Sequence, residues 1–318
     1  MKKRYLSLIF LILIIGSLFA CSNNNSEEDN SKENYSFAFL PNTQNNTFQT
    51  AMTDTFEKMA EEEGYDFTML DPDYDLNTQL SQMTDAANQE FDAVFMIPVD
   101  SSGIRQGLEE LNDRNIPVFN VDTAVTEEDQ ELVESVIATN AFMAGQIMGE
   151  QMVEDYPDGA EIAILDFPSN ESTVQRVEGF KDGLGDEISK FEVVAQQDGK
   201  ATTDDSLPIA QDIIQSNPDI DAFFAINDPS ALGVTSAIDD SGKDDIDVYS
   251  IDASPDGKEA LLNGSFTAVS AQVPVEIAET AFESAEDYLD GKDIDNEILL
   301  DSFNVDKEEA EKTKDEWQ

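Results

Sequence analysis

YSFAFLPNTQNNTFQTAMTDTFEKMAEEEG, residues 35–64, joins an apolar stretch to an amphipathic one. Residues 35–40 are mostly aromatic and aliphatic, which favours a buried strand. In residues 47–63 the apolar positions recur at helical spacing and share one face, namely Phe48, Met52, Phe56, Met59 and Ala60. Gly64 follows as a typical helix-ending residue. The stretch therefore predicts a strand followed by a helix that packs back against it.

The same alternation continues along the chain in two sets. Strands are predicted near 65–70, 93–97, 116–121 and 133–138, then near 160–165, 191–196, 221–226, 246–251 and 266–272, with a last one at 297–304 before a charged tail. Helices are predicted near 76–89, 102–114, 141–155, 172–184, 205–216, 229–240, 255–262 and 274–290. This pattern predicts an α/β protein of two doubly wound, Rossmann-like lobes with parallel sheets and a ligand cleft between them.

The charge balance excludes several classes of function. The 318 residues include 17 basic and 69 acidic side chains, a net charge of -52, so nucleic acids and anionic lipid surfaces would be repelled. The chain has no His, which excludes Ser/His/Asp hydrolases and His-ligated metal sites. Any catalysis would depend on carboxylates or Lys, and no pair of carboxylates is distinguished by the sequence, so we predict a protein that is not an enzyme.

The first residues have the form of an export signal. Met1-Lys2-Lys3-Arg4 precedes an apolar run at 5–20, which is short for a membrane span, and then comes Cys21, the only cysteine. Residues 18–21, LFAC, resemble a lipobox, so we predict a signal peptide at 1–20, lipidation of Cys21 and a flexible tether over 21–34. The alternative is an ordinary signal peptide with an incidental Cys21. The predicted location is the outer face of the cytoplasmic membrane, by lipid anchor, or the periplasm.

Cleavage after residue 20 would make the charge more extreme. The remaining 298 residues hold 14 basic and 69 acidic side chains, a net charge of -55. Molar salt shortens the Debye length to about 3 Å and screens such self-repulsion, so we interpret the protein as halophilic. The alternative is an acidic surface without that adaptation.

Polar or aromatic side chains stand just after several predicted strands. Asn46 and Phe48 follow the first strand, and the others end later strands, namely Asp122, Asn227, Asp252 and Gln272. In a doubly wound sheet the carboxyl ends of the strands form the ligand face. These side chains therefore predict a site for a polar small molecule.

Seven segments in order resemble the ribose-binding-protein family, the type I substrate-binding proteins of sugar ABC transporters. They are FAFLPNTQNNTF (37–48), FDAVFMIPVDSSG (91–103), NIPVFNVDT (115–123), RVEGF (176–180), FFAINDPSALG (223–233), SIDASPDG (250–257) and SAQVP (270–274). The resemblance implies a three-crossing hinge near 137–140, 271–274 and 300–303. It also implies an N-terminal lobe of 35–138 plus 274–301 and a C-terminal lobe of 139–273 plus 302–318.

The resemblance further implies a set of ligand-binding residues, which are Asn46, Phe48, Asp122, Thr123, Asn227, Asp252 and Gln272. Carboxylates would accept hydrogen bonds from sugar hydroxyls, amides would donate and accept, and Phe48 would pack on the sugar ring. Two alternatives stay open: Asp122, Asn227 or Asp252 would cap the next helix, or Phe48 would belong to the core.

The chain departs from the ribose pattern in ways that argue against ribose itself. Thr123 and Val174 stand where ribose binders carry arginines, and Lys200-Ala201 stands near a missing aromatic residue. Two cations remain nearby, Lys200 and Arg176, of which we interpret Arg176 as a structural residue of its helix. If Lys200 enters the cleft, a neutral sugar or polyol is expected, and otherwise an amino sugar or aminated inositol.

The resemblance implies a binding protein that captures a small sugar or polyol and delivers it to an ABC transporter permease. The alternative is a ligand-sensing receptor subunit for a sensor kinase or chemoreceptor. We expect a monomer without cofactor or metal. A calcium site is not expected at the calcium-loop-like run that begins at Asp71, because this run has Leu76 and Gln82 where that loop needs Gly and Glu. We interpret this run as an acidic turn that caps the next helix.

Overall fold

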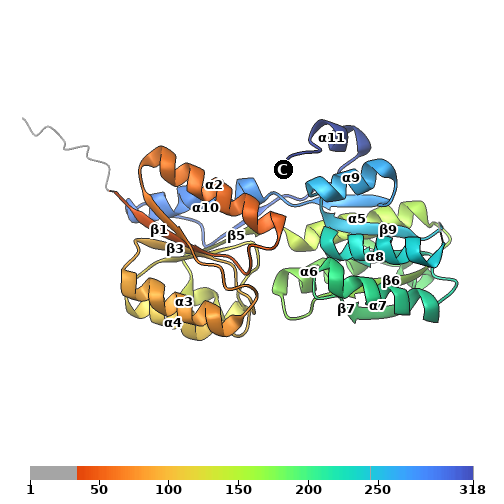
Figure 1. Ribbon diagram of the computed structural model, residues 1–318, viewed down its shortest axis with the longest axis horizontal. Helices are drawn as coiled ribbons and strands as arrows, with labels where there is room; N and C mark the ends of the chain where they lie inside the picture. Colours follow the sequence, from red (N-terminus) through yellow and green to blue (C-terminus); the bar gives the residue numbers. More distant parts are fainter. Residues whose placement is uncertain (1–33, 244, 318) are drawn as a thin grey trace, which may run out of the picture. The chain divides into compact units, whose positions relative to one another are not determined.

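The structure is a computed structural model that describes residues 34–243 and 245–317 (Figure 1). The predicted signal peptide, Cys21 and the tether up to residue 33 lie outside the described residues. Residues from Tyr35 onward form one compact unit that contains two parallel sheets.

The first sheet has six parallel strands in the order β11-β5-β4-β3-β1-β2. They are β1 (Ser36–Leu40), β2 (Asp66–Met69), β3 (Ala93–Met96), β4 (Val118–Val121), β5 (Ser135–Thr139) and β11 (Glu297–Leu300). Helices α2 (Thr47–Glu63) and α10 (Pro274–Leu289) cover one face, and α3 (Leu76–Gln89) and α4 (Arg105–Asp113) cover the other. Alternate residues of β1 separate these layers, since Phe37 and Phe39 pack with α2 and α10 while Ala38 and Leu40 pack with α3 and α4.

The second sheet has five parallel strands in the order β10-β9-β8-β6-β7. They are β6 (Glu161–Asp166), β7 (Glu192–Asp198), β8 (Ala222–Ala225), β9 (Asp247–Asp252) and β10 (Ala268–Ala271). Helices α5 (Ala141–Asp155) and α6 (Glu171–Gly183) pack on one face. The other face carries α7 (Thr203–Ser216), α8 (Asp228–Ser241), α9 (Pro255–Asn263) and α11 (Lys307–Lys312). We call the two sheets with their helices the first half and the second half.

The chain passes between the two halves three times. It leaves the first sheet after β5, returns after β10 to form α10 and β11, and leaves again after β11. At the last passage Asn304 forms an antiparallel bridge with Ser270 of the second half. The predicted α/β class with two doubly wound parallel sheets is thus confirmed.

The C-terminal part differs from the sequence prediction. The strand expected at 297–304 ends at Leu300, because the backbone then pairs with the other sheet through Ala271 N–H and the Phe303 carbonyl at 2.8 Å. The charged tail contains α11, whose N-cap Asp306 accepts from the Glu309 N–H. Two short 3-10 helices were not predicted, η1 (Glu127–Leu132) and η2 (Gly185–Lys190), because they are polar and lack an apolar period.

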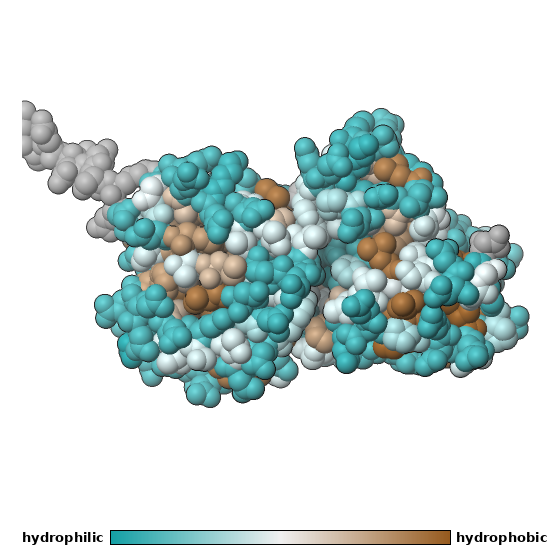
Figure 2. All heavy atoms as spheres, viewed as in Figure 1, coloured by the Kyte–Doolittle hydropathy of each residue, from teal (hydrophilic) through white to brown (hydrophobic). Residues whose placement is uncertain are grey.

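The surface is mostly polar, as the large number of charged side chains leads us to expect. Figure 2 shows hydrophilic residues over most of the face in view. None of the helices in residues 34–243 and 245–317 combines the length and the apolar character that a membrane crossing requires.

The acidic turn at 71–75 behaves as interpreted, since Asp75 Oδ1 accepts from the Thr78 N–H at 2.7 Å and so caps α3. Within the described part of the chain, no group of three or more acidic or Cys side chains is arranged to hold a metal ion.

Candidate functional site

One cavity lies where the carboxyl ends of strands from both sheets come together. All seven residues predicted as ligand-binding line it, namely Asn46, Phe48, Asp122, Thr123, Asn227, Asp252 and Gln272. Other lining residues were not predicted to bind a ligand, among them Asn42, Gln49, Asn170, Ser172 and Arg176. The strand-end argument therefore located the cavity but not its whole lining.

The wall from the first half is built on the start of α2. Asn46 caps this helix, because its side-chain oxygen accepts from the Phe48 N–H at 2.9 Å. Phe48 is 3% exposed and belongs to the apolar cluster beneath α2. The two alternatives for Phe48 are therefore not exclusive, since the ring packs in the core and the residue also lines the cavity.

Asp122 follows β4 in the left-handed backbone region, with φ at 60°. It is 9% exposed, and Thr123 Oγ1 donates to its Oδ2 at a long 3.3 Å. Burial raises the pKa of Asp122 to about 6, while the Arg176 guanidinium opposes that rise. This carboxylate is thus ionised near neutral pH with little hydrogen bonding, so it is suited to accept from solute hydroxyls.

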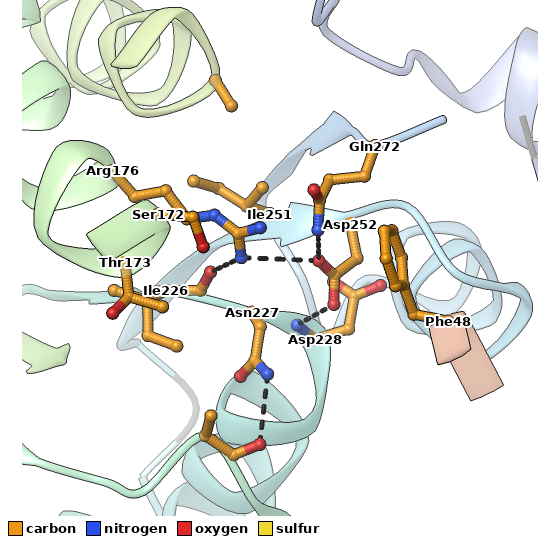
Figure 3. Close-up of polar contacts among 12 residues, drawn as sticks. Phe48, Ser172, Thr173, Arg176, Ile226, Asn227, Asp228, Ile251, Asp252 and Gln272 are labelled. Carbon is orange, nitrogen blue, oxygen red and sulfur yellow. Dashed lines mark hydrogen bonds and ion pairs between the residues drawn. The ribbon is translucent and has the colours of Figure 1, made fainter. Parts of the chain in front are cut away.

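Asp252, at the end of β9, is better supported than Asp122 (Figure 3). Gln272 Nε2 donates to its Oδ1 at 2.8 Å, and the Asp228 N–H donates to its Oδ2 at 3.2 Å. Arg176 Nη1 lies 3.6 Å from Asp252 Oδ1. Burial raises the pKa of Asp252, and the charge of Arg176 opposes the rise. The cavity therefore holds a partly neutralised carboxylate beside the less compensated Asp122.

Arg176 has a larger part in the site than the sequence indicated. We interpreted it as a structural residue of its helix, and its Nη1 does donate to the Ile226 carbonyl at 2.7 Å. The same side chain is 4% exposed, lines the cavity and faces Asp252 (Figure 3). Helical spacing alone did not reveal this position, because it does not tell which side of α6 meets the strand ends.

Close packing of α5 on α6 fixes the position of the Arg176 backbone. A Cβ added at Gly145 would lie 1.9 Å from the Arg176 carbonyl oxygen, and one at Gly179 would lie 1.9 Å from the Phe142 carbonyl oxygen. Only glycine allows backbones to approach so closely. These two glycines therefore set the distance of α6 from α5 and with it the reach of Arg176.

Lys200 does not enter the cavity. Its side chain is 61% exposed, and its Nζ lies 3.7 Å from Asp205 Oδ1. The hypothesis that Lys200 compensates the buried carboxylates is therefore not supported by its position, and Arg176 supplies the cation instead.

The helix-cap alternative holds for one of the three residues concerned. Asn227 Oδ1 accepts from the Ser230 N–H at 3.0 Å and caps α8, while its Nδ2 donates to the Ala201 carbonyl at 3.1 Å. Asp252 does not cap the helix after it, because Ser254 does so for α9. Asp122 precedes no α-helix directly.

Two lining residues that the sequence analysis missed carry unsatisfied atoms. Within the described part of the chain, Asn42 Oδ1 and Gln49 Oε1 are buried without a hydrogen-bond partner. Buried polar atoms of this kind cost free energy unless something pairs with them. Their nearness to Asn46 in the sequence was the available signal, since all three stand at the end of β1 or the start of α2.

Residues of the two halves meet beside the cavity. Asn170 Nδ2 donates to Thr123 Oγ1 at 3.0 Å, and the hydroxyls of Thr123 and Ser172 lie 3.3 Å apart. Thr123 follows a strand of the first sheet, whereas Asn170 and Ser172 stand at the start of α6. The cavity is thus bordered by direct polar contacts between the halves.

Two doubly wound halves with a polar cavity at their strand ends define a two-lobed solute-binding protein. Residues 37–293 match the periplasmic binding protein domain family, so the chain belongs to that family. It is 31% identical over 305 residues to the ribose import binding protein of Bacillus subtilis, covering 94% of this chain and 97% of that protein. It is 29% identical over 265 residues to the ribose import binding protein of Escherichia coli, covering 83% and 88%. The chain is thus a ribose-binding-protein-like member of the sugar ABC transporter substrate-binding proteins.

A solved structure gives the same fold. The Caulobacter myo-inositol binding protein bound to myo-inositol superimposes with a TM-score of 0.82 at 24% identity. The match covers 88% of this chain and 95% of that one. At this identity the likeness concerns the fold, and the type I periplasmic binding protein architecture is confirmed.

Proposed function

We propose that this protein captures a small neutral sugar or polyol outside the cytoplasm and delivers it to an ABC importer. The observation that carries the proposal is the cavity, where two buried carboxylates and a buried guanidinium lie among amide side chains and the aromatic residues Phe48 and Phe167. Hydroxyl groups both donate and accept, so a polyol satisfies carboxylates and Arg at once. An aromatic ring packs against the apolar face of a sugar.

A neutral solute fits the charges of the cavity better than an amine. Arg176 lies against Asp252 and also interacts with Asp122, which lowers the pKa of both carboxyls relative to burial alone. A solute ammonium would come close to the guanidinium of Arg176 in a desolvated space, where like charges repel strongly. The ring hydroxyls of a neutral solute meet no such repulsion.

The relatives support a compact polyhydroxylated solute without fixing its identity. The names of the similar proteins refer to ribose and to myo-inositol. Thr123 and Val174 replace two arginines that the ribose pattern leads us to expect, so the hydrogen-bond donors around this cavity differ from that pattern. We therefore propose a sugar or polyol other than ribose as the best-bound solute.

Binding would proceed by closure of two lobes. We assign 35–138 plus 274–301 to the N-terminal lobe and 139–273 plus 302–318 to the C-terminal lobe. Motion about the three crossings would let the solute enter and then be enclosed between residues of both lobes. The polar contacts between Thr123, Asn170 and Ser172 support this proposal, since they connect the halves beside the cavity.

The family and the first residues of the sequence support a proposal for location and partners. The periplasmic binding protein family favours an extracytoplasmic location. We further propose a signal peptide at 1–20, a lipid anchor at Cys21, a permease partner and a monomeric state. Replacing Cys21 by Ser would release the protein from the membrane without changing solute affinity. Membrane fractionation and mass spectrometry of the N-terminal residue test this, and an unacylated wild-type protein would contradict it.

The central experiment is a thermal-shift screen of D-ribose, D-allose, D-fructose, myo-inositol and their amino analogues, followed by calorimetry. A free solute concentration of 100 times the dissociation constant stabilises a protein by about 2.7 kcal/mol, which the screen detects. Lys200→Ala is the matched control, because its side chain lies outside the cavity and should leave affinity unchanged. Recovery of the solute unaltered would support a binding protein that is not an enzyme. The absence of binding across the panel would contradict the proposal.

A further inference from the structure

The segment 306–317 lies outside the part of the chain that matches the family, which ends at residue 293. Its helix α11 packs on the second half, where Ala310 joins the apolar cluster formed by α7, α8 and α9, as does Val305 just before the segment. Figure 1 shows α11 beside α9, with which it is in contact. The segment ends in Trp317, the only tryptophan of the sequence.

A buried lysine holds this segment on the second half. Lys258 of α9 is 0% exposed, and its Nζ donates to the carbonyls of Thr313 at 2.9 Å and Glu316 at 2.7 Å. Burial lowers the pKa of Lys258, and the carboxylates of Glu309, Glu316 and Asp228 oppose that shift. An ammonium placed in the interior must be hydrogen-bonded, so these two carbonyls are a specific anchor and not an incidental contact. The backbone just before Trp317 is therefore fixed relative to α9.

The anchored tryptophan touches the first half at the solute cavity. The rings of Trp317 and Phe48 pack edge to face, with centroids 5.5 Å apart and an interplanar angle of 85°. Phe48 lines the cavity from the start of α2. A segment held by the second half thus contacts an aromatic ring of the first half that lines the cavity.

We propose that Trp317 is a positioning residue of the solute site: it fixes the ring of Phe48 and does so from the opposite half of the molecule. The inference rests on the proposed solute-binding function. Because the two rings belong to different halves, their contact is complete only when the halves are together. Trp317 would therefore favour the solute-bound arrangement without touching the solute itself.

Affinity measurements test the effect on the solute site. D-ribose and myo-inositol are titrated by calorimetry into the full chain and into the variants Trp317→Ala and Trp317→Phe at one fixed NaCl concentration. We expect Trp317→Ala to weaken binding roughly three- to tenfold, the range that an edge-to-face aromatic pair contributes. Trp317→Phe keeps an aromatic edge and should restore most of the affinity. Wild-type affinity in Trp317→Ala would overturn the proposal, and so would equal losses in the Ala and Phe variants.

A measurement without solute separates this inference from the proposed function. Trp317 is the only tryptophan, so acrylamide quenching of tryptophan emission reports its exposure alone. Quenching should be weak in the wild type and stronger in Lys258→Met and in Phe48→Leu, which remove the anchor and the ring partner. Equal quenching in the wild type and both variants would overturn the arrangement. If the wild type binds neither D-ribose nor myo-inositol while quenching behaves as expected, the choice of solute fails and the aromatic contact stands.

Discussion

Replacing Asp122 by Asn should make the protein more stable and a poorer binder at the same time. Burial raises the pKa of this carboxyl from its ordinary value of 3.8 to about 6. The carboxyl of Asp122 therefore binds a proton more tightly in the folded state than in the unfolded state. As the pH rises from about 4 to about 6, the ionisation of Asp122 lowers the free energy of unfolding. The side-chain amide of the Asp122→Asn variant carries no charge at any of these pH values, and that pH-dependent cost would disappear.

The size of the effect follows from the two pKa values. The full difference corresponds to about 3 kcal/mol, since one pKa unit is worth about 1.4 kcal/mol. Between about pH 4.5 and about pH 7.5 roughly 2 kcal/mol of it should develop, because the unfolded carboxyl is already largely ionised at the lower pH. The lower limit keeps the protein above its isoelectric point of about 4.1.

Urea unfolding of the solute-free proteins at fixed NaCl measures this effect across that pH range. The free energy of unfolding of Asp122→Asn minus that of the wild type should grow by roughly 2 kcal/mol from about pH 4.5 to about pH 7.5. Carboxylates that do not interact with Asp122 titrate equally in both proteins and cancel in the difference, whereas Asp252, whose charge raises the pKa of Asp122, makes a smaller contribution of its own. A difference that does not change with pH would refute the reasoning about the burial of Asp122.

Solute affinity should move in the opposite direction. Hydrogen bonds to a charged group contribute about 1.5–3 kcal/mol, so Asp122→Asn should weaken binding by roughly 10- to 100-fold. Solute hydroxyls that donate to the carboxylate lower its pKa, so wild-type affinity is complete above about pH 6 and declines below that value. The Asp122→Asn variant should show a smaller decline, since only Asp252, whose pKa is also raised by burial, still titrates in the cavity.

Three further predictions concern other features. Gln49 Oε1 has no hydrogen-bond partner among the described residues, so Gln49→Met should leave the free energy of unfolding without solute unchanged or higher. The same variant should weaken solute binding by about 1–3 kcal/mol in calorimetry. Unchanged affinity would remove Gln49 from the site. Among matched neutral and aminated inositols, the neutral compound should bind more tightly at fixed high salt, because Arg176 occupies the cavity wall, and the reverse order would favour an amine ligand. The melting temperature should rise from low to molar NaCl, because the net charge is -52, and a midpoint independent of salt would contradict the halophilic interpretation.

Much of the fold could be predicted because its signals are local. The helix predicted at 47–63 has the bounds of α2, since its apolar face and Gly64 are both visible in the sequence. The last strand was predicted too long because the chain changes sheets after Leu300, and a change of hydrogen-bonding partner leaves no mark on apolar periodicity. Local pattern thus predicted elements well and the pairing of residues 301–305 poorly.

In the candidate site, too, the residues with a local sequence signal could be predicted and the others could not. Asp122, Asn227 and Asp252 could be singled out because each follows a predictable strand, and parallel strands present their carboxyl ends together. Asn42 and Gln49 had only their nearness to Asn46 as a signal, because their significance lies in atoms left without partners, and that depends on every neighbouring side chain. Of the two nearby cations, the sequence led us to consider Lys200 for the cleft and to interpret Arg176 as structural, yet Lys200 is exposed beside Asp205 and Arg176 is buried beside Asp252.

The burial of Arg176 connects the glycines of two helices to the charge of the cavity. Gly145 and Gly179 let α5 and α6 approach until an added Cβ would collide with the facing backbone. That approach places Arg176 where its guanidinium reaches both the Ile226 carbonyl and Asp252. If α6 stood farther away, Asp252 would be a buried carboxylate without its cation, which is strongly destabilising. The helix packing and the charge balance of the cavity are therefore one structural requirement, met by two glycines that do not line the cavity.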